Sequence, residues 1–293
     1  MWLPPKNMKS DENPKPSDKK QSGPPSARTA VRQLVVVPLA VYAVWMLETF
    51  LLEKNVNLFA RIGPGELILY TVVACVLTGI ILPFLILQKS FLSGDVNLFQ
   101  IGFRSLSRTL TMGIGTILAG YIAVILFSPF GADQGAFAGA FLLLLPTAMA
   151  SAMICWVLAG THIQAYVRGG GSQVSIPAGV ITTAMLFGIT PLVHSNMGSY
   201  GIALSSSMGA GIIAAFFFFA VRDVYATTLV IAGMSAFLMA GRIDPVTLAH
   251  PAPAVYASAA LATVVLIGIH WYLFRHYTTI QIPVLRGSPK DPE

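Results

Sequence analysis

The stretch AFAGAFLLLLPTAMASAMICWVLAG, residues 136–160, decides the fold of this 293-residue chain. It contains no charged residue over its 25 positions. A helix needs about 20 apolar residues to cross the roughly 30 Å hydrocarbon core of a bilayer, so this run is long enough. It also lacks the amphipathic stripe by which a helix of a soluble protein faces core on one side and water on the other. The stretch therefore predicts a membrane-spanning helix.

The rest of the chain repeats this pattern. Its residues are 55% hydrophobic and only 10% charged, with a mean hydropathy of +0.72, whereas a soluble domain carries about 25% charged residues. We therefore expect an all-α fold: a polytopic transmembrane helical bundle of about eight spans, over residues 32–276. The predicted spans are 33–52, 67–87, 109–128, 136–160, 175–193, 202–221, 224–241 and 254–274.

The distribution of lysine and arginine predicts the orientation. With eight spans both termini lie on one side, and that side carries 15 of the 18 lysines and arginines. The other side carries Lys54, Arg61 and Arg242. Because cytoplasmic loops are enriched in these cations, we expect cytoplasmic N- and C-termini and a location in the plasma (inner) membrane. This reasoning assigns the formal charge of +6 to loops at a membrane, and we expect no nucleic acid partner.

The two ends of the chain are polar. Residues 1–31 are rich in proline, lysine and serine and have little apolar content, so they cannot bury enough surface to order themselves. We expect a disordered, basic, Pro-rich cytoplasmic tail there, either solvated or tethered to a partner or to anionic lipid headgroups. Residues 277–293 form the predicted cytoplasmic C-terminal tail.

Four residues form a candidate polar site. Glu48 is the one acidic residue inside a predicted span. A carboxylate in hydrocarbon is costly and often functional, so Glu48 serves either a proton, ion or partner site or a structural hydrogen bond near the interface. His162, Gln164 and Arg168 follow the span 136–160, where they either satisfy the last carbonyls of the helix or contribute to a site.

The sequence offers no pattern for metal or nucleotide chemistry. Its five histidines form no HExxH pair, and Cys75 and Cys155 lie in separate apolar blocks. Neither a glycine-rich phosphate loop nor a nucleophile elbow is present. We therefore expect no catalytic residue, no metal and no cofactor. The expected partners are the lipid bilayer and a membrane protein.

Small residues recur in the span 202–221. Ser205, Gly209, Gly211 and Ala215 let a second helix approach closely, as small residues do in lipid. The neighbouring helix is either another span of this chain or a partner subunit.

The order of features resembles the CPBP family, the intramembrane proteases related to type II CAAX prenyl endopeptidases, over about residues 96–241. VNLFQIGFRS (96–105) is similar to the family's segment before its core, and IQAYVRG (163–169) to its EExxxRG segment. AMLFGITP (184–191) is similar to its FxxxH helix, and residues 209–237 to its closing hairpin, which ends in HxxxN.

The resemblance implies a bundle that has lost its protease site. The family's two glutamates activate water, and they fall on Ile163 and Gln164; its arginine is kept as Arg168. The other four positions, which in the family are Phe, His, His and Asn, fall on Phe187, Pro191, Gly233 and Phe237. Metal-bound water needs ligands with lone pairs, which Ile, Pro, Gly and Phe side chains do not supply.

Three functions follow as hypotheses. The first is a non-catalytic CPBP-like scaffold or accessory subunit, a pseudoenzyme that binds a partner protein or lipid. The second is a diverged CPBP-type intramembrane metalloprotease, and the third is a transporter or channel, for which Glu48 is nearly the only intramembrane polar group.

Overall fold

The chain folds as an all-helical bundle. The computed structural model describes residues 31–59, 62–93, 96–127, 134–194, 200–239, 243 and 245–277. Within these ranges every regular element is a helix and no strand occurs. The prediction of an all-α bundle is confirmed. The predicted tails, 1–31 and 277–293, lie outside the described residues except for Val31 and Tyr277.

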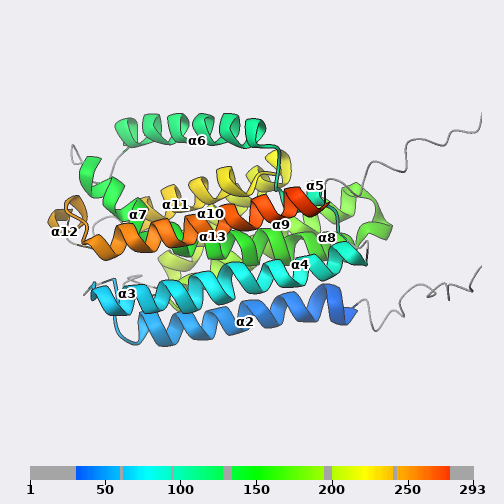
Figure 1. Cartoon of the computed structure of the whole chain (residues 1–293), viewed down its shortest axis with the longest axis horizontal. Helices are drawn as coiled ribbons and strands as arrows, with labels where there is room; N and C mark the ends of the chain where they lie inside the picture. The colour runs from blue at the N-terminus through cyan, green and yellow to red at the C-terminus, as the bar shows by residue number, and fades with distance from the viewer. Residues whose placement is uncertain are drawn as a thin grey trace, which may run out of the picture.

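Long helices run side by side along the bundle (Figure 1). In the described part of the chain, six are long and apolar enough to cross a membrane, and each coincides with a predicted span. These six are Arg32–Lys54, Pro64–Leu92, Gln134–Tyr166, Ser172–Leu192, Leu204–Val221 and Pro253–Tyr277. The remaining two predicted spans coincide with α6 (Leu106–Phe127) and with α11 (Val224–Met239). The chain is therefore an integral membrane protein that passes the bilayer several times.

Several long helices change winding along their length. In the first helix, α2 (Val37–Thr49) lies between π-helical segments Arg32–Val36 and Phe50–Lys54. The second consists of α3 (Pro64–Tyr70), π-helical Thr71–Ile81 and α4 (Leu82–Leu92). In a π-helical segment the backbone hydrogen bonds span five residues and not four, and such segments often occur at functional sites.

Residues 136–160 form the centre of the bundle. They lie in the helix made of α7 (Gln134–Ser151), π-helical Ala152–Gly160 and α8 (Thr161–Tyr166). Every residue of Ala152–Gly160 is buried. Small residues allow this packing, because a Cβ on Gly79 would lie only 2.3 Å from the Cβ of Ala150.

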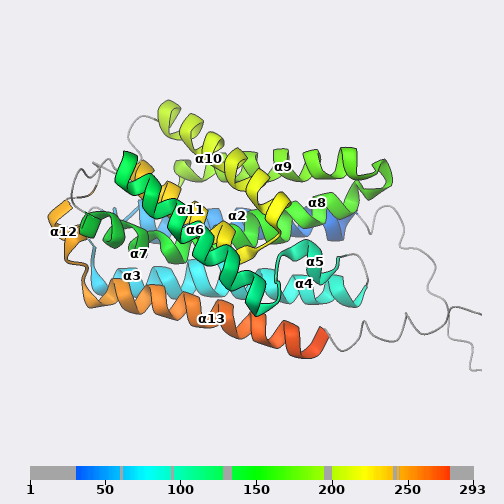
Figure 2. The same cartoon turned by 90° about the horizontal axis from the view of Figure 1, so that it is seen from above.

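The remaining helices surround this centre (Figure 2). The helix α9 (Ser172–Ile189) continues into a 3₁₀ turn, Thr190–Leu192, and packs along α10 (Tyr200–Val221). The last helix is α13 (Pro253–Tyr277). Two short helices were not predicted from the sequence: α5 (Leu98–Ile101) and α12 (Pro245–Ala249).

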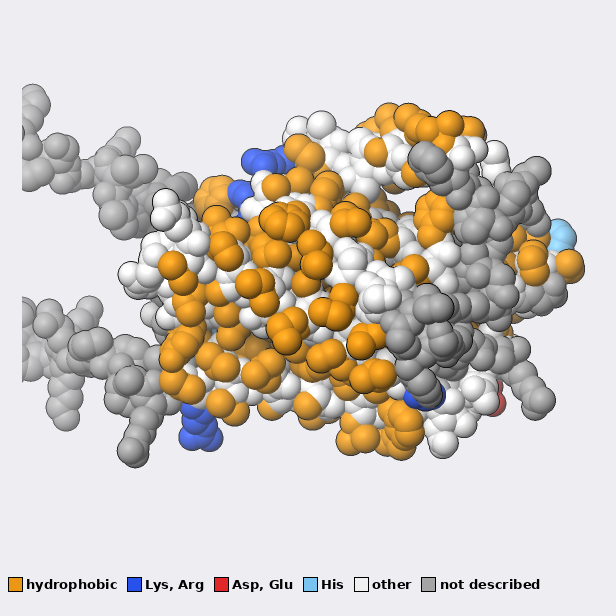
Figure 3. Space-filling model, turned by 180° about the vertical axis from the view of Figure 1, so that it is seen from behind, with side chains coloured by type: hydrophobic (Ala, Val, Ile, Leu, Met, Phe, Trp, Pro, Cys, Tyr) orange, Lys and Arg blue, Asp and Glu red, His pale blue; other side chains and the backbone are white. Residues whose placement is uncertain are grey.

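The helix α6 stands off from the others (Figure 1). Among its residues with described side chains, Thr109 alone is buried. Apolar side chains such as Leu118 and Ile122 are more than half exposed. Apolar side chains also cover the face of the molecule seen in Figure 3. In water such a surface would drive association, whereas in a bilayer it meets lipid.

Candidate functional site

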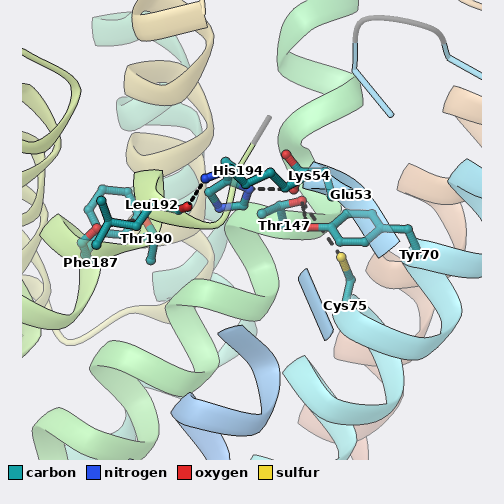
Figure 4. Close-up of polar contacts among 9 residues, drawn as sticks. All are labelled: Glu53, Lys54, Tyr70, Cys75, Thr147, Phe187, Thr190, Leu192 and His194. Atoms are coloured by element: carbon teal, nitrogen blue, oxygen red, sulfur yellow. Dashed lines mark hydrogen bonds and ion pairs between the residues drawn. The ribbon is translucent and has the colours of Figure 1, made fainter. Parts of the chain in front are cut away.

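A buried acid–base pair lies at one end of the bundle (Figure 4). Glu53 belongs to the last turn of the first helix, and His194 follows the 3₁₀ turn after α9. The Nδ1 atom of His194 lies 2.5 Å from Oε2 of Glu53, and both side chains are buried. An ionisable pair withdrawn from water within an apolar bundle is a functional-site candidate by default.

A second contact joins the same two segments. Lys54 Nζ donates a hydrogen bond of 2.5 Å to the carbonyl oxygen of Leu192. The indole of Trp45 lies edge-on to the His194 ring, with 6.4 Å between the ring centroids. The end of the first helix is thus fastened to the end of α9 by charge, hydrogen bonding and ring packing.

Further polar groups lie beside the pair, on the second helix and on α7. The hydroxyls of Tyr70 and Thr147 are 3.1 Å apart, and Cys75 Sγ lies 3.8 Å from Thr147 Oγ1 (Figure 4). One buried polar atom in this region, Trp45 Nε1, has no hydrogen-bond partner among the described residues. A buried polar atom without a partner costs about 1–3 kcal/mol, so water molecules are expected here.

A small cavity reaches this region. Its volume is about 40 Å³, which suffices for a few water molecules. Most of its polar lining consists of hydroxyls beside His194. The lining residues with polar side chains are Trp45, Thr147, Ser151, Thr190, His194, Ser207 and Ser235. This volume suits water and proton exchange.

The predicted polar residue Glu48 lies five residues before Glu53 on the same helix. Glu48 is half-buried, and its buried Oε2 has no described hydrogen-bond partner. Glu53 was missed because the predicted first span stopped at residue 52, whereas the helix runs to Lys54. The helical spacing of Trp45, Thr49 and Glu53, four residues apart, was the available signal, since such residues share one helix face. All three are fully buried.

The other three predicted polar residues lie at the opposite end of the bundle. His162 follows Thr147 by 15 residues along one continuous helix, which places the two about 22 Å apart at 1.5 Å per residue. His162 Nε2 lies 2.8 Å from Ser90 Oγ, and its Nδ1 lies 2.8 Å from the Leu158 carbonyl. The structure therefore does not bring Glu48 together with His162.

Gln164 and Arg168 join a network of polar contacts at that end. Gln164 Oε1 accepts a hydrogen bond of 2.8 Å from Arg222 Nη2. Arg168 Nη2 donates to Gln100 Oε1 at 3.2 Å, and Arg222 Nη1 donates to the Gln100 carbonyl at 2.8 Å. Gln164 thus serves as an acceptor for an arginine.

Two further arginines gather at the turn between α10 and α11. Arg222 has a left-handed φ of 53°, which turns the chain sharply. Arg104 Nε donates to the Arg222 carbonyl at 2.8 Å, and Arg108 Nη2 donates to the Val221 carbonyl at 3.3 Å. These cations satisfy the last carbonyls of α10 and oppose the negative end of its dipole. We call Arg104, Arg108 and Arg222 the arginine cluster.

The acid at this turn, Asp223, accepts hydrogen bonds from other groups. Asp223 Oδ2 accepts from Thr109 Oγ1 at 2.9 Å, and Oδ1 accepts from the backbone N–H of Ala226 at 2.9 Å. It thus holds the first turn of α6 and caps the start of α11. Among the described residues, no ion pair joins a carboxylate to the arginine cluster.

The positive charges of the cluster disfavour one another. Burial, together with the neighbouring charge of Arg104, lowers the pKa of Arg222 to about 10. Burial and the charge of Arg108 also lower the pKa of Arg104, while Asp223 opposes this shift. Within the described part of the chain, Asp223 is the one carboxylate that acts on the pKa of these arginines, so the cluster of three arginines keeps an excess of positive charge.

The predicted helix-packing residues divide between two environments. Gly211 and Ala215 are buried, and a Cβ on Gly211 would lie 3.1 Å from the carbonyl oxygen of Ala184 in α9. Ser205 and Gly209 lie on the exposed face of α10, and a Cβ on Gly209 would meet nothing within 4 Å. Gly211 and Ala215 therefore serve packing within the bundle, whereas Ser205 and Gly209 face lipid or a partner.

The positions carried over from the CPBP motifs do not form one site. Gln164 lies beside the arginine cluster, whereas Pro191 lies beyond the far end of α9. A helix of 21 residues, Ser172–Leu192, separates these regions by about 30 Å. Phe237 packs against Phe137 with ring centroids 5.1 Å apart. Within the described residues, no group of three His, Cys, Asp or Glu side chains is placed to hold a metal.

Comparison with known proteins finds no relative: no family model, no curated protein and no solved structure matches the chain. The functional interpretation therefore rests on the contacts of this chain's own residues.

Proposed function

We propose that this chain is a non-catalytic membrane scaffold or accessory subunit that pairs with a helix of another membrane protein through the outer face of α10. The proposal includes eight spans, cytoplasmic termini and a CPBP-like helix order. The CPBP-like helix order rests on the sequence resemblance alone. The cationic end of the bundle is then the cytoplasmic end.

One observation carries the proposal. The exposed face of α10 changes from small to large residues along one line: Gly209 offers open space, while Ile213 and Phe216 are 56% and 64% exposed. In lipid, helix association depends on close backbone approach at small residues and on side-chain packing. A partner helix is expected to approach at Gly209 and to pack against Ile213 and Phe216.

The polar regions support a non-catalytic role. Gln164, at the position of a catalytic glutamate in the resemblance, accepts a hydrogen bond from Arg222. The cavity beside Glu53 and His194 measures about 40 Å³ and has room for a few water molecules. The pair itself joins two helix ends, which suits a rigid binding scaffold.

The test is site-specific photocrosslinking in the native membrane. A photoreactive residue at Ile213 is expected to give one discrete adduct with a membrane protein. The same residue at Ile267, which is 52% exposed on α13, is expected to give none. Gly209→Leu should abolish the Ile213 adduct, since it fills the approach site.

The matched control is Gly268→Leu on α13, where a Cβ also meets nothing within 4 Å. It should leave the adduct unchanged. An adduct consisting of two copies of this chain would show self-association instead. Equal adducts from Ile213 and Ile267, or an adduct that survives Gly209→Leu, would remove the basis for docking at α10.

A second candidate function is favoured by the Glu53–His194 pair, which has the composition of an acid–base site. In a diverged hydrolase or a proton-linked transporter, Glu53→Gln would abolish the activity while the purified protein stayed folded. In a scaffold, the same variant would retain the Ile213 adduct. Hydrolase or proton-flux activity in liposomes that is lost in Glu53→Gln would decide for this second function.

A further inference from the structure

The seam between α6 and the rest of the bundle begins at the arginine cluster. Thr109 is buried against Asp223 at its base. One helical turn further, Met112 and Gly113 are half-buried, and a Cβ on Gly113 would meet nothing within 4 Å. We call the bundle-facing residues Thr109, Met112, Gly113 and Thr116 the α6 seam. It is closed at its cationic base and open above it.

The apolar surface continues along α6 away from the cluster. Leu110, Ile114 and Ile117 are each 55–57% exposed beside the seam. An acyl chain can therefore extend from the base of the seam along α6, where the one further hydroxyl of the seam, that of Thr116, already donates to the Met112 carbonyl. Charge lies at one end of this surface and hydrocarbon along the rest, which is the arrangement of charge and apolar surface in a phospholipid.

The cluster also retains donors for a ligand. Within the described contacts, Arg104 is engaged through Nε and Arg108 through Nη2. The remaining guanidinium nitrogens can donate to phosphate oxygens, and such charge-assisted bonds are about twice as strong as neutral ones. Arg222, whose terminal nitrogens are both occupied, contributes positive potential.

We propose that an anionic phospholipid binds here, with its phosphate on Arg104 and Arg108 and an acyl chain in the α6 seam. The anion offsets the excess positive charge of the arginine cluster. The acyl chain fills the open space beside Gly113 and packs against the side of α6 that the other helices cover only in part. This site requires membrane insertion but is independent of the partner proposed for α10.

The experiment measures lipid retention by native mass spectrometry of the full-length, delipidated protein in detergent. Phosphatidylglycerol and phosphatidylcholine are added separately, and soluble glycerol 3-phosphate serves as a competitor. Wild type should retain phosphatidylglycerol on the order of thirty-fold more tightly than phosphatidylcholine, as expected for two arginine contacts. Glycerol 3-phosphate should not displace the lipid, because it lacks the acyl chains.

Two pairs of variants locate the site. Arg104→Gln with Arg108→Gln should remove the preference for phosphatidylglycerol. Lys89→Gln with Arg275→Gln should retain it, because these exposed cations lie outside the cluster. Gly113→Phe fills the seam without altering any arginine and should also weaken retention. Gly115→Phe on the exposed side of α6 should leave retention unchanged.

The outcomes separate the alternatives. Equal retention of the two lipids, or unchanged retention after the double arginine substitution, would overturn the proposal. Loss in both double variants would indicate a diffuse charge effect and would also overturn it. Displacement by glycerol 3-phosphate would mean that the headgroup alone is recognised, which would overturn the assignment of an acyl chain to the seam. Because Arg104 and Arg108 also satisfy carbonyls of α10, the Gly113 and Gly115 pair keeps the test valid if the arginine variant unfolds.

Discussion

The two polar ends of the bundle handle charge in opposite ways. At one end Glu53 and His194 are buried against each other beside a cavity of about 40 Å³. At the other end the arginine cluster lies at the turn that contains Asp223, whose oxygens accept hydrogen bonds from Thr109 and Ala226. A paired and enclosed charge suits a structural or water-linked role. An excess of positive charge beside an open apolar seam suits a ligand of opposite sign.

The largest expected effect breaks the enclosed pair. Glu53→Ala should destabilise the protein by about 3–5 kcal/mol, because removal of one partner leaves a buried polar or charged group uncompensated. Glu53→Gln keeps a hydrogen-bond acceptor and should cost clearly less. Thermal unfolding in mild detergent measures both. If Glu53→Ala unfolds at the wild-type temperature, the pair is accessible to water and the contrast between the two ends is lost.

The second prediction concerns how α6 is held at the cationic end. Thr109→Val removes the hydroxyl that donates to Asp223, and a buried acceptor left unsatisfied costs about 1–3 kcal/mol. Because Thr109 is the one described side chain of α6 that is buried, the substitution should also increase hydrogen exchange in α6. Thr116→Val, on the same seam but bonded only to its own helix at Met112, is the matched control. Equal exchange in both variants would contradict an anchor at Thr109.

The sequence predicted the helices well because spanning is a local property. An apolar run of about 20 residues specifies a membrane helix whatever its neighbours are, and residues 136–160 form such a helix. That this helix is the buried centre is seen only in the structure. Helix ends are less well specified, since a charged residue near the interface can belong to either the helix or the loop. The predicted first span ended two residues before the helix does, so it excluded Glu53 and contained Glu48 as its one acidic residue.

The side-chain contacts between different helices could not be predicted from the sequence, for a different reason. Glu53 and His194 are 141 residues apart, and Gln164 and Arg222 are 58 apart. Such contacts depend on how whole helices pack, which local composition does not report. The predicted set Glu48, His162, Gln164 and Arg168 therefore mixed the two ends of the bundle. The three arginines of the cluster were included among the cations of the predicted cytoplasmic side. The sequence did not predict that they lie together at the turn after α10.

The smallest expected effect tests whether cations at this end are equivalent. Arg275 is exposed and lies over the Trp271 ring, 5.2 Å from its centroid. An exposed cation–π contact contributes little, so Arg275→Gln should shift the midpoint of thermal unfolding by about 1–2 °C at most. It should not alter phosphatidylglycerol retention. A shift as large as that of Thr109→Val would mean that charge is distributed over the whole cationic face, and the arginine cluster would lose its distinction from the other cations there.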